Sequence, residues 1–174
     1  MASANEDLLS YFEANSATAK LYKHQECRTS EESAQARAEA GAGMVIGAKA
    51  ILVKADVRDS NPQFFLLVLP GFSKIDSKKL KTELKDRIPG FRSFRFATSD
   101  EMAQVAHGMQ PGCMPPFGKP IFPGINYVFV DDSLSLHPRV GFNAAKFTQS
   151  AVLNIEEYLR ILNHDGIFSF ATEG

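Results

Sequence analysis

Two histidine–cysteine pairs are the first residues in this sequence whose types suggest chemistry. His24 and Cys27 are three positions apart, and His107 is followed by Cys113. These spacings are not those of a recognised zinc finger or ribbon, and the two pairs are far apart in the chain. No base is placed beside either cysteine by sequence, so a cysteine nucleophile has no support. We predict no metal, no cofactor and no Cys–His catalytic pair.

Two single side chains are stronger candidates. Lys49 lies between two alanines, just before the apolar residues ILV, in a segment typical of a core strand. By the two-residue period of a strand it faces opposite to Ala48, Ala50 and Leu52. A solvent-facing lysine on an edge strand is the simpler interpretation, because lysine is mostly exposed. His137 precedes a proline and can polarise a carbonyl or hydroxyl group, unless it only hydrogen-bonds its own loop.

A proline- and glycine-rich stretch interrupts the middle of the chain. Residues 106–124, AHGMQPGCMPPFGKPIFPG, contain five of the nine prolines and four of the twelve glycines. Proline removes a main-chain donor, so this stretch is neither a helix nor a central strand. It is therefore either a linker between two domains or a rigid loop that holds a ligand.

The segment 74–95 is locally basic. It has eight lysines and arginines against three acidic residues, a net charge of +5, although the whole chain has a formal net charge of −1. A solvated helix face is the commoner origin of such a run. The alternative is a patch that binds a phosphate backbone, with an affinity that falls as salt rises.

The elements that must position these residues follow from periodicity and capping signals. We expect helices at 5–14, 30–40, 77–87, 99–107 and 155–162. We expect strands at 20–26, 44–56, 64–70, 91–97 and 125–131, and a bulged strand or hairpin within 137–153. The order does not alternate strictly, which favours a single α+β domain over residues 1–174, with short helices around a curved, mixed and partly barrel-like sheet. Ordered elements flank residues 106–124 on both sides, which argues against a linker.

Composition and the N-terminus restrict the class of protein. An apolar content of 44% and a charged content of 22% are ordinary for a soluble domain. No basic region followed by an apolar run opens the chain, and no apolar run is long enough to span a bilayer. With only two cysteines, we expect a cytoplasmic protein without disulfides.

Taken in order, these pieces resemble the YbaK-like aminoacyl-tRNA deacylases, a family that also forms the editing insertion of bacterial prolyl-tRNA synthetases. The similarity runs from about His24 to Leu162. It rests on the helix start TSEE at 29–32, the strand with Lys49, FFLLVLPG at 64–71, and FRFATSDEMAQVAHG leading into the Gly-x-x-Pro-Gly loop at 108–112. His137 with its proline then precedes the closing helix.

The resemblance implies an enzyme that hydrolyses the ester between a wrong amino acid and the 3′ end of a tRNA. Alanine on the proline tRNA is the expected substrate, since a proline pocket cannot strongly exclude a smaller amino acid. Cysteine on the same tRNA is an alternative. A further alternative is a module that binds tRNA ends or a synthetase without catalysis, or a piece of a longer prolyl-tRNA synthetase. Neither DNA nor a membrane is an expected partner.

The resemblance also implies roles for individual residues. The expected catalytic residues are Lys49 at the terminal nucleotide, the main chain of Gly108 and Gly112 at the ester carbonyl, and His137 at the border of the amino-acid pocket. Bare main-chain N–H groups can stabilise the oxyanion of ester hydrolysis, so no catalytic triad is needed. The expected substrate contacts are His24, Thr29, Lys79, Met109, Gln110, Pro111 and Phe117.

Overall fold

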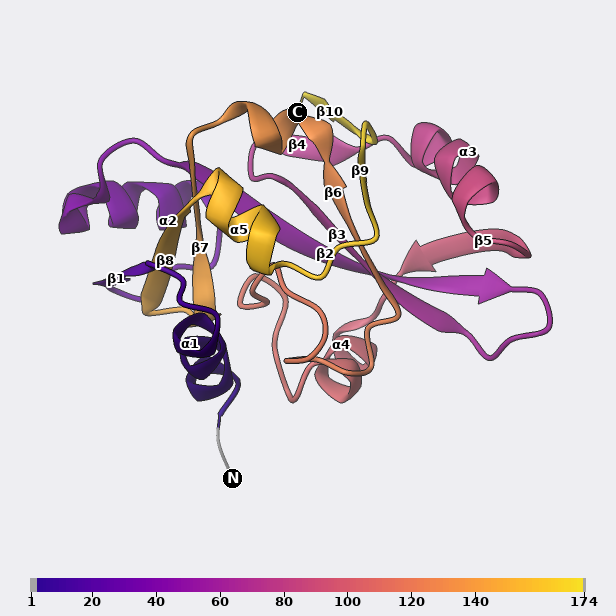
Figure 1. The fold of residues 1–174 in the computed structure, drawn as a ribbon, viewed down its shortest axis with the longest axis horizontal. Helices are drawn as coiled ribbons and strands as arrows, with labels where there is room; N and C mark the ends of the chain where they lie inside the picture. The colour runs from indigo at the N-terminus through magenta and orange to yellow at the C-terminus, as the bar shows by residue number, and fades with distance from the viewer. Residues whose placement is uncertain (1–2, 174) are drawn as a thin grey trace.

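Helices and strands follow one another in a mixed order along residues 3–173, the part of the chain that the computed structural model describes (Figure 1). The helices are α1 (Ala4–Ala14), α2 (Ser30–Arg37), α3 (Ser77–Arg87), α4 (Ser99–Val105) and α5 (Ile155–Ile161), with a π-helical turn η1 (Ala38–Ala42) and a 3₁₀ turn η2 (Asp132–Leu136). The strands are β1 (Lys20–Lys23), β2 (Ile46–Val57), β3 (Gln63–Pro70), β4 (Ser73–Ile75), β5 (Phe91–Phe96), β6 (Tyr127–Asp131), β7 (Arg139–Lys146), β8 (Gln149–Asn154), β9 (Gly166–Phe168) and β10 (Ala171–Glu173). The predicted α+β class is confirmed.

One large mixed sheet contains most of these strands. Its order is β1-β8-β7-β2-β3-β6-β9, and β5 pairs with β2 as a branch, while β4 and β10 form a separate pair. The β2–β7, β3–β6 and β6–β9 pairs are parallel, and the others are antiparallel. Strands β1 and β9 end this path without pairing to each other, so the sheet is open and not a closed barrel within the described residues.

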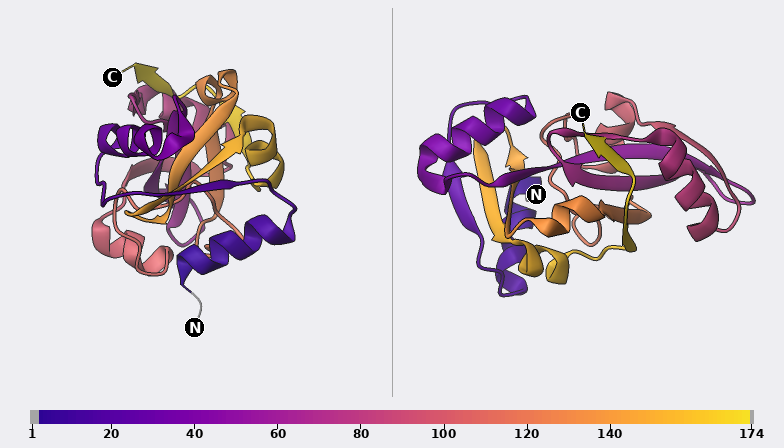
Figure 2. Two further views of the ribbon diagram at one scale, coloured as in Figure 1. Left: turned by 90° about the vertical axis from the view of Figure 1, so that its left-hand side faces the viewer. Right: turned by 90° about the horizontal axis from the view of Figure 1, so that it is seen from above.

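The long strand β2 carries the sheet from one end of the molecule to the other. Figure 1 and the view from above in Figure 2 show α2 with β7 and β8 at one end, and α3 with β5 at the other. As a whole β2 is not an edge strand, since it has β3 on one side and β7 and β5 on the other, but neither β7 nor β5 pairs with it at Lys49.

Apolar side chains pack on both faces of the sheet. Leu66 and Val68 of β3 point into a core with α1, α4 and α5, while Phe65 and Leu67 point into a second core with α3. Since adjacent residues of a strand point to opposite faces, β3 is buried on both. This confirms that residues 64–70 form a central strand.

The proline- and glycine-rich stretch 106–124 is part of this architecture. Its Met114, Phe117 and Phe122 are buried in the first core. The hydroxyl of Tyr158 in α5 donates a hydrogen bond of 2.6 Å to the carbonyl oxygen of Pro116, deep inside the protein. The stretch is a packed loop of one domain and not a linker.

The sequence predicts capping boxes at Thr29 with Glu32 and at Thr98 with Glu101, and helix caps at Asp76 and at Asn154 with Glu157. Most of these helix starts are present, with two corrections. Thr98 and Glu101 form a reciprocal capping box at α4, and Asp76 caps α3. At α2 the Thr29 hydroxyl accepts the expected hydrogen bond, but the carboxylate of Glu32 accepts from the N–H of Arg28 instead of that of Thr29.

The second correction concerns the cap predicted for α5. Asn154 lies at the N-cap position, but its side chain makes no capping hydrogen bond. The carboxylate of Glu157 accepts instead from the N–H of Thr18, at 2.7 Å. No helix in residues 3–173 is long and apolar enough to cross a bilayer.

Candidate functional site

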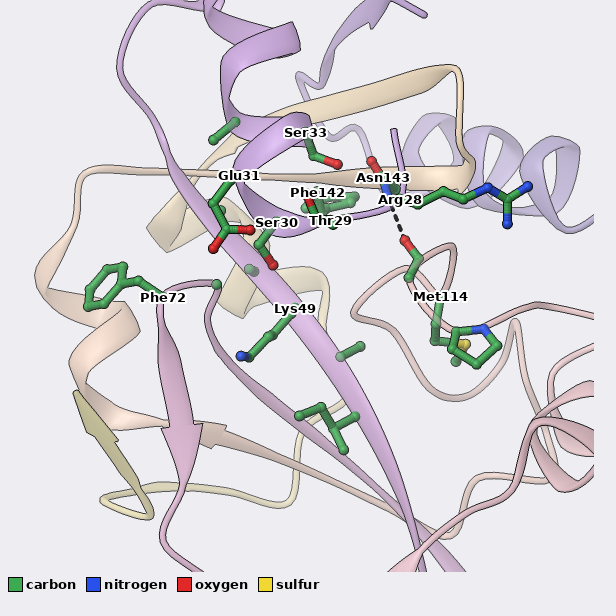
Figure 3. A pocket seen from close by; sticks show the side chains of 18 of the residues that line it. Arg28, Thr29, Ser30, Glu31, Ser33, Lys49, Phe72, Met114, Phe142 and Asn143 are labelled. Atoms are coloured by element: carbon green, nitrogen blue, oxygen red, sulfur yellow. Dashed lines mark hydrogen bonds between the residues drawn. The ribbon is translucent and has the colours of Figure 1, made fainter. Parts of the chain in front are cut away.

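A cavity of about 490 Å³ opens beside the first half of β2 (Figure 3). Seven segments surround it: β2, the start of α2, the turn after β3, the end of β5, α4, the loop at 111–114, and β7. The residues that line it are Arg28, Thr29, Ser30, Glu31, Ser33, Ala34, Arg37, Gly47, Ala48, Lys49, Ala50, Ile51, Leu52, Gly71, Phe72, Phe96, Ala97, Met102, Pro111, Gly112, Met114, Phe142 and Asn143.

A gap in strand pairing creates one wall of this cavity. β2 pairs with β7 only at Ile46 and Gly47, and with β5 only from Val53 onward. The main-chain oxygen of Gly47 accepts a hydrogen bond from the N–H of Gly71, on the β3 side of the strand. The main-chain oxygen of Leu52 accepts one from the N–H of Ala97, on the opposite side. Because main-chain groups alternate along a strand, the N–H and C=O of Ala50 face the gap. The cavity therefore contains a free strand edge that can hydrogen-bond a ligand.

The ammonium group of Lys49 lies on this wall in a mixed electrostatic environment. Its side chain extends from β2 below Glu31 (Figure 3). Partial burial lowers its pKa, the carboxylate of Glu31 opposes this effect, and the nearby Lys74 ammonium lowers the pKa further. No ion pair within residues 3–173 joins Lys49 to a carboxylate. The cation is therefore available for an anionic group of a ligand.

Opposite Lys49, Asn143 of β7 connects the strand to the loop. Its amide Nδ2 donates a hydrogen bond of 2.6 Å to the carbonyl oxygen of Gly112. That carbonyl can only accept, which fixes the orientation of the amide. The other end of the amide, Oδ1, is buried without a hydrogen-bond partner. A buried acceptor without a donor is costly, so Oδ1 is suited to a donor group of a ligand.

Arg37 of α2 is a buried cation that lines the cavity. Only 3% of this residue is exposed, and burial lowers the pKa of its guanidinium. Its NH1 donates to the hydroxyl of Ser150 at 3.4 Å, while Nε has no partner. A Cβ added to Gly47 or Gly141 would lie within 3 Å of this guanidinium. The two glycines therefore make room for a buried cation.

Four residues predicted from sequence line the cavity: Thr29, Lys49, Pro111 and Gly112. Lys49 and Gly112 come from segments 63 residues apart in the chain. The hydroxyl of Thr29 also accepts the capping hydrogen bond of α2, so its position is fixed by the helix.

The other predicted residues do not line it. Gly108 has a φ of +82° and closes α4 with a hydrogen bond to Ala103, which explains a glycine there. Phe117 is 2% exposed and packs edge-on against aromatic rings of the core. The remaining predicted residues outside the lining are Met109, Gln110, His24, His137 and Lys79. Their roles stay predictions.

Two of these residues still have a structural link to the cavity. Gln110 accepts a long hydrogen bond of 3.4 Å from Arg28, which lines it. His24 bonds through Nε2 to the hydroxyl of Ser150, the same hydroxyl that Arg37 contacts. Lys79 instead points to the hydroxyl of Ser169, at 2.6 Å.

Sequence reasoning missed Arg37, Asn143 and the two aromatic residues at the rim. Phe72 is 56% exposed and Phe96 is 54% exposed. The alternation of Phe and Arg in FRSFRF indicated that one side of β5 is exposed, which could have drawn attention to Phe96. Nothing near Asn143 in the sequence indicates its contact with Gly112.

Neither cysteine is prepared to act as a nucleophile. Cys27 lies 3.8 Å from Nδ1 of His24, but burial and nearby carboxylates raise the pKa of its thiol. Burial raises the pKa of Cys113 to about 11. Both thiols are therefore protonated near neutral pH. Within residues 3–173 no three His, Cys, Asp or Glu side chains gather in a way that could hold a metal ion.

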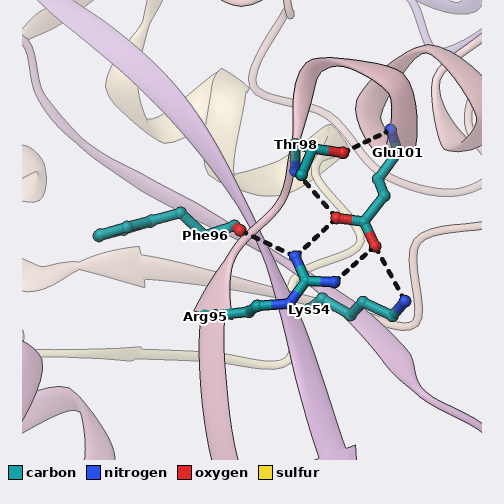
Figure 4. A network of polar contacts seen from close by, with 5 residues as sticks. All are labelled: Lys54, Arg95, Phe96, Thr98 and Glu101. Carbon is teal, nitrogen blue, oxygen red and sulfur yellow. Dashed lines mark hydrogen bonds and ion pairs between the residues drawn. The ribbon is translucent and has the colours of Figure 1, made fainter.

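A polar network holds the far rim of the cavity in place (Figure 4). Glu101 accepts from Arg95 through both carboxylate oxygens, at 2.7 and 2.9 Å, and pairs with Lys54 at 2.9 Å. Arg95 also donates to the carbonyl oxygen of Phe96. The hydrogen bonds to Arg95, to the Thr98 main chain and to Lys54 hold the pKa of Glu101 far below its usual range. The network therefore ties β5 and α4 to β2 beside Phe96.

Comparisons with known proteins classify the chain by its sequence. Residues 24–161 match the family model of the aminoacyl-tRNA editing domain. A segment of 70 residues is 36% identical to the proline–tRNA ligase of Ralstonia nicotianae and 34% identical to that of Ralstonia pickettii. Each match covers 40% of this chain but only 11% of the ligase.

Solved structures share the fold. A crystal structure of a proposed trans-editing enzyme for prolyl-tRNA synthetase aligns over 100% of this chain and 99% of its own, with a TM-score of 0.71 and 19% identity. A crystal structure of a hypothetical protein aligns over 96% of this chain and 100% of its own, with a TM-score of 0.74 and 19% identity. The open-edged sheet is thus the framework of a known fold.

Proposed function

The chain belongs to the aminoacyl-tRNA editing domain family, and from this premise we propose that it hydrolyses the ester joining an incorrect amino acid to the 3′ end of a tRNA. The proposed substrate is alanine carried by the proline tRNA. One observation carries the proposal: a single cavity joins the Lys49 cation, the free edge of β2 at Ala50 and the Gly112–Asn143 contact. In this proposal Lys49 binds the phosphate of an aminoacyl nucleotide. The strand edge at Ala50 binds the ester carbonyl, and Asn143 binds the amino group.

Lys49 is proposed to bind the terminal nucleotide through its phosphate. A half-buried ammonium without a carboxylate partner among residues 3–173 favours an anion over a neutral ligand. The neighbouring Lys74 adds positive potential, while Glu31 limits it. In this role Lys49 positions the ester and takes no part in bond breaking.

Asn143 is proposed to bind the amino group of the amino acid. Its unpartnered Oδ1 accepts, and a protonated amino group donates. Because Nδ2 is held by Gly112, the amide cannot turn to present a donor in its place. This contact would distinguish an aminoacyl ester from an ester without an amino group.

Hydrolysis itself needs water and main-chain donors in this proposal. Water attacks the carbonyl carbon, and the negative charge that develops on the carbonyl oxygen is stabilised by the N–H of Ala50, with that of Gly112 as a second candidate donor. The bond between the carbonyl carbon and the ribose oxygen then breaks. The proton from water passes to the ribose oxygen, with help from the neighbouring ribose hydroxyl, so tRNA and the free amino acid are released.

The biological setting is proposed from the relatives. The ligases that match 70 residues of this chain act with proline, and one structural neighbour is described as a trans-editing enzyme for prolyl-tRNA synthetase. We propose that this chain edits the proline tRNA in trans and meets that synthetase in the cytoplasm.

The test uses purified protein and one proline tRNA charged in turn with alanine, cysteine, serine or proline. We expect release of alanine well above the rate in buffer, and little release of proline. Faster release of cysteine than of alanine would assign the alternative substrate. Salt-sensitive tRNA binding without release of any amino acid would show a binding module and overturn the enzymatic proposal.

A further inference from the structure

A second hollow of about 450 Å³ lies between α3 and β5. It is lined by Ser77, Lys78 and Lys81 from the helix and by Ser93, Phe94, Arg95 and Phe96 from the strand. Phe96 also lines the first cavity. One exposed aromatic residue therefore borders both hollows, so the two lie next to each other at Phe96.

We propose that the RNA strand leading to the 3′ end leaves the first cavity over Phe96 and runs along this α3–β5 groove. An unpaired base stacks on the Phe96 ring, and the ammonium groups of Lys78 and Lys81 bind the phosphates that precede it. The proposal rests on the proposed function and adds to it a direction of approach and a surface for the tRNA.

Phe96 has the properties of a stacking platform. It is a large apolar side chain that stays 54% exposed at the end of β5, where its burial would be favourable. Phe94 meets it edge-on at 6.4 Å, and Arg95 holds its main-chain carbonyl within the Glu101 network (Figure 4). The main chain of Phe96 is thus held in place and more than half of the residue is exposed, and any base can stack on an exposed aromatic face.

Several cations of α3 and β5 already have partners. Arg95 is occupied by Glu101, Arg87 pairs with Glu83, and Lys79 points to Ser169. Lys78 and Lys81 are exposed, and no ion pair within residues 3–173 involves them.

The two lysines also stand in a suitable arrangement. Residues three apart on a helix lie side by side, so both ammonium groups reach the same edge of the groove. Lys85 follows one turn later on that face and is also exposed. An aromatic face beside a row of unpaired cations is the combination that binds single-stranded nucleic acid.

The test measures binding of two fluorescent RNA hairpins that copy the acceptor stem of the proline tRNA. One ends in the unpaired 3′ CCA tail, and the other is blunt. The variants are Phe96→Leu, Phe96→Tyr and the double variant Lys78→Gln with Lys81→Gln. The matched control is Lys20→Gln with Lys23→Gln on β1, at the opposite end of the molecule (Figure 1).

We expect Phe96→Leu to weaken binding of the tailed hairpin about fivefold or more and to leave the blunt hairpin unchanged, because only unpaired bases can stack. Phe96→Tyr should bind like the wild type. The Lys78/Lys81 variant should weaken binding of both hairpins and lower the salt dependence, log Kd against log salt, by about one to two in slope. The Lys20/Lys23 variant should match the wild type.

Equal affinities of the wild type and both sets of variants for the tailed hairpin would overturn the proposal, as would equal losses in the Lys20/Lys23 control. Absence of any salt-dependent binding by the wild type would also overturn it. Hydrolysis of an alanyl ester of adenosine 5′-monophosphate, which keeps the phosphate proposed for Lys49 but has no RNA strand, separates this failure from failure of the proposed function. The wild type should hydrolyse it well above the rate in buffer if only the strand path is wrong, and should not accelerate it if the proposed function fails.

Discussion

The side-chain amide of Asn143 donates a hydrogen bond of 2.6 Å to the main-chain carbonyl oxygen of Gly112, across 31 residues of sequence. This contact joins strand β7 to the loop that closes the cavity. It also determines which end of the amide the cavity receives, since only Oδ1 remains without a partner. One hydrogen bond therefore holds the loop against β7 and also orients the amide oxygen that is proposed to bind the amino group.

Replacement of Asn143 tests the recognition of the amino group. We expect Asn143→Ala to lower kcat/KM for the alanyl ester about 10- to 100-fold, since hydrogen bonds to charged groups contribute about 1.5–3 kcal/mol. An ester of lactic acid on the same tRNA replaces the ammonium group with a hydroxyl. The wild type should prefer the alanyl ester strongly, and the variant should show little preference.

The matched control is Asn163→Ala, because Asn163 also donates to a main-chain carbonyl, that of Lys119, without lining the cavity. The Asn163→Ala variant should prefer the alanyl ester over the lactic acid ester as strongly as the wild type does. An unchanged preference in Asn143→Ala would show that Oδ1 does not bind the amino group.

Alanine substitutions at two glycines of the loop can distinguish the effect of backbone strain on stability from an effect on activity. Gly108 and Gly112 both have positive φ, +82° and +87°. An alanine at either position should cost about 1–2 kcal/mol of stability, because L-residues disfavour this conformation. Only a Cβ at Gly112 meets a neighbour, the main-chain oxygen of Arg28 at 3.2 Å, and only Gly112 lines the cavity.

We therefore expect Gly108→Ala and Gly112→Ala both to unfold at lower denaturant concentrations than the wild type, Gly112→Ala at the lowest, while only Gly112→Ala loses deacylation, by about tenfold or more. Parallel loss of activity in both variants would give Gly108 the role that the sequence resemblance implies. Full activity in Gly112→Ala would remove the loop from the site.

Local signals in the sequence predicted the helices and strands well. The features that the sequence did not predict depend on contacts between distant residues. Thr98 and Glu101 are three residues apart, and a capping box needs nothing else. The role of Glu101 as the centre of a network depends on Lys54, which approaches only because β2 pairs with β5. The same holds for the gap at Ala50, which arises where pairing with β7 has ended and pairing with β5 has not begun.

The candidate site shows the same division between local and distant information. The motif with Lys49 and the loop at Pro111 and Gly112 were identified because each is a compact pattern. Arg37 was missed because its burial depends on the absent side chains of Gly47 and Gly141, which a linear pattern does not relate to it. His137 was chosen by resemblance, and the structure leaves it outside the lining.

The Glu101 network predicts a pH-dependent contribution to stability. The folded-state pKa of this carboxyl is lowered from its ordinary value of 4.5, chiefly by the hydrogen bonds from Arg95. The stabilisation is therefore complete above that ordinary value and is lost as pH falls toward the folded-state pKa. The difference in Tm between the wild type and Glu101→Gln should be largest near pH 7 and should shrink below about pH 4.5.

Glu83→Gln is the control, because Glu83 forms an exposed ion pair with Arg87 within α3. Such pairs contribute little, so its Tm should stay near that of the wild type throughout. A Tm difference for Glu101→Gln that stays constant from pH 7 to pH 3 would show that the carboxylate charge does not hold β5 to α4.

The most direct test of the cavity as the site of hydrolysis is single-turnover deacylation of alanyl-tRNA of the proline type by Lys49→Ala. Removal of Lys49 should not impair folding, because burial already lowers the pKa of its ammonium group. Lys23→Ala on β1, exposed and distant, is the control. We predict that the wild type and Lys23→Ala release alanine at equal rates well above that in buffer, and that Lys49→Ala loses about 10- to 100-fold. A wild-type rate in Lys49→Ala would contradict the assignment of this cavity.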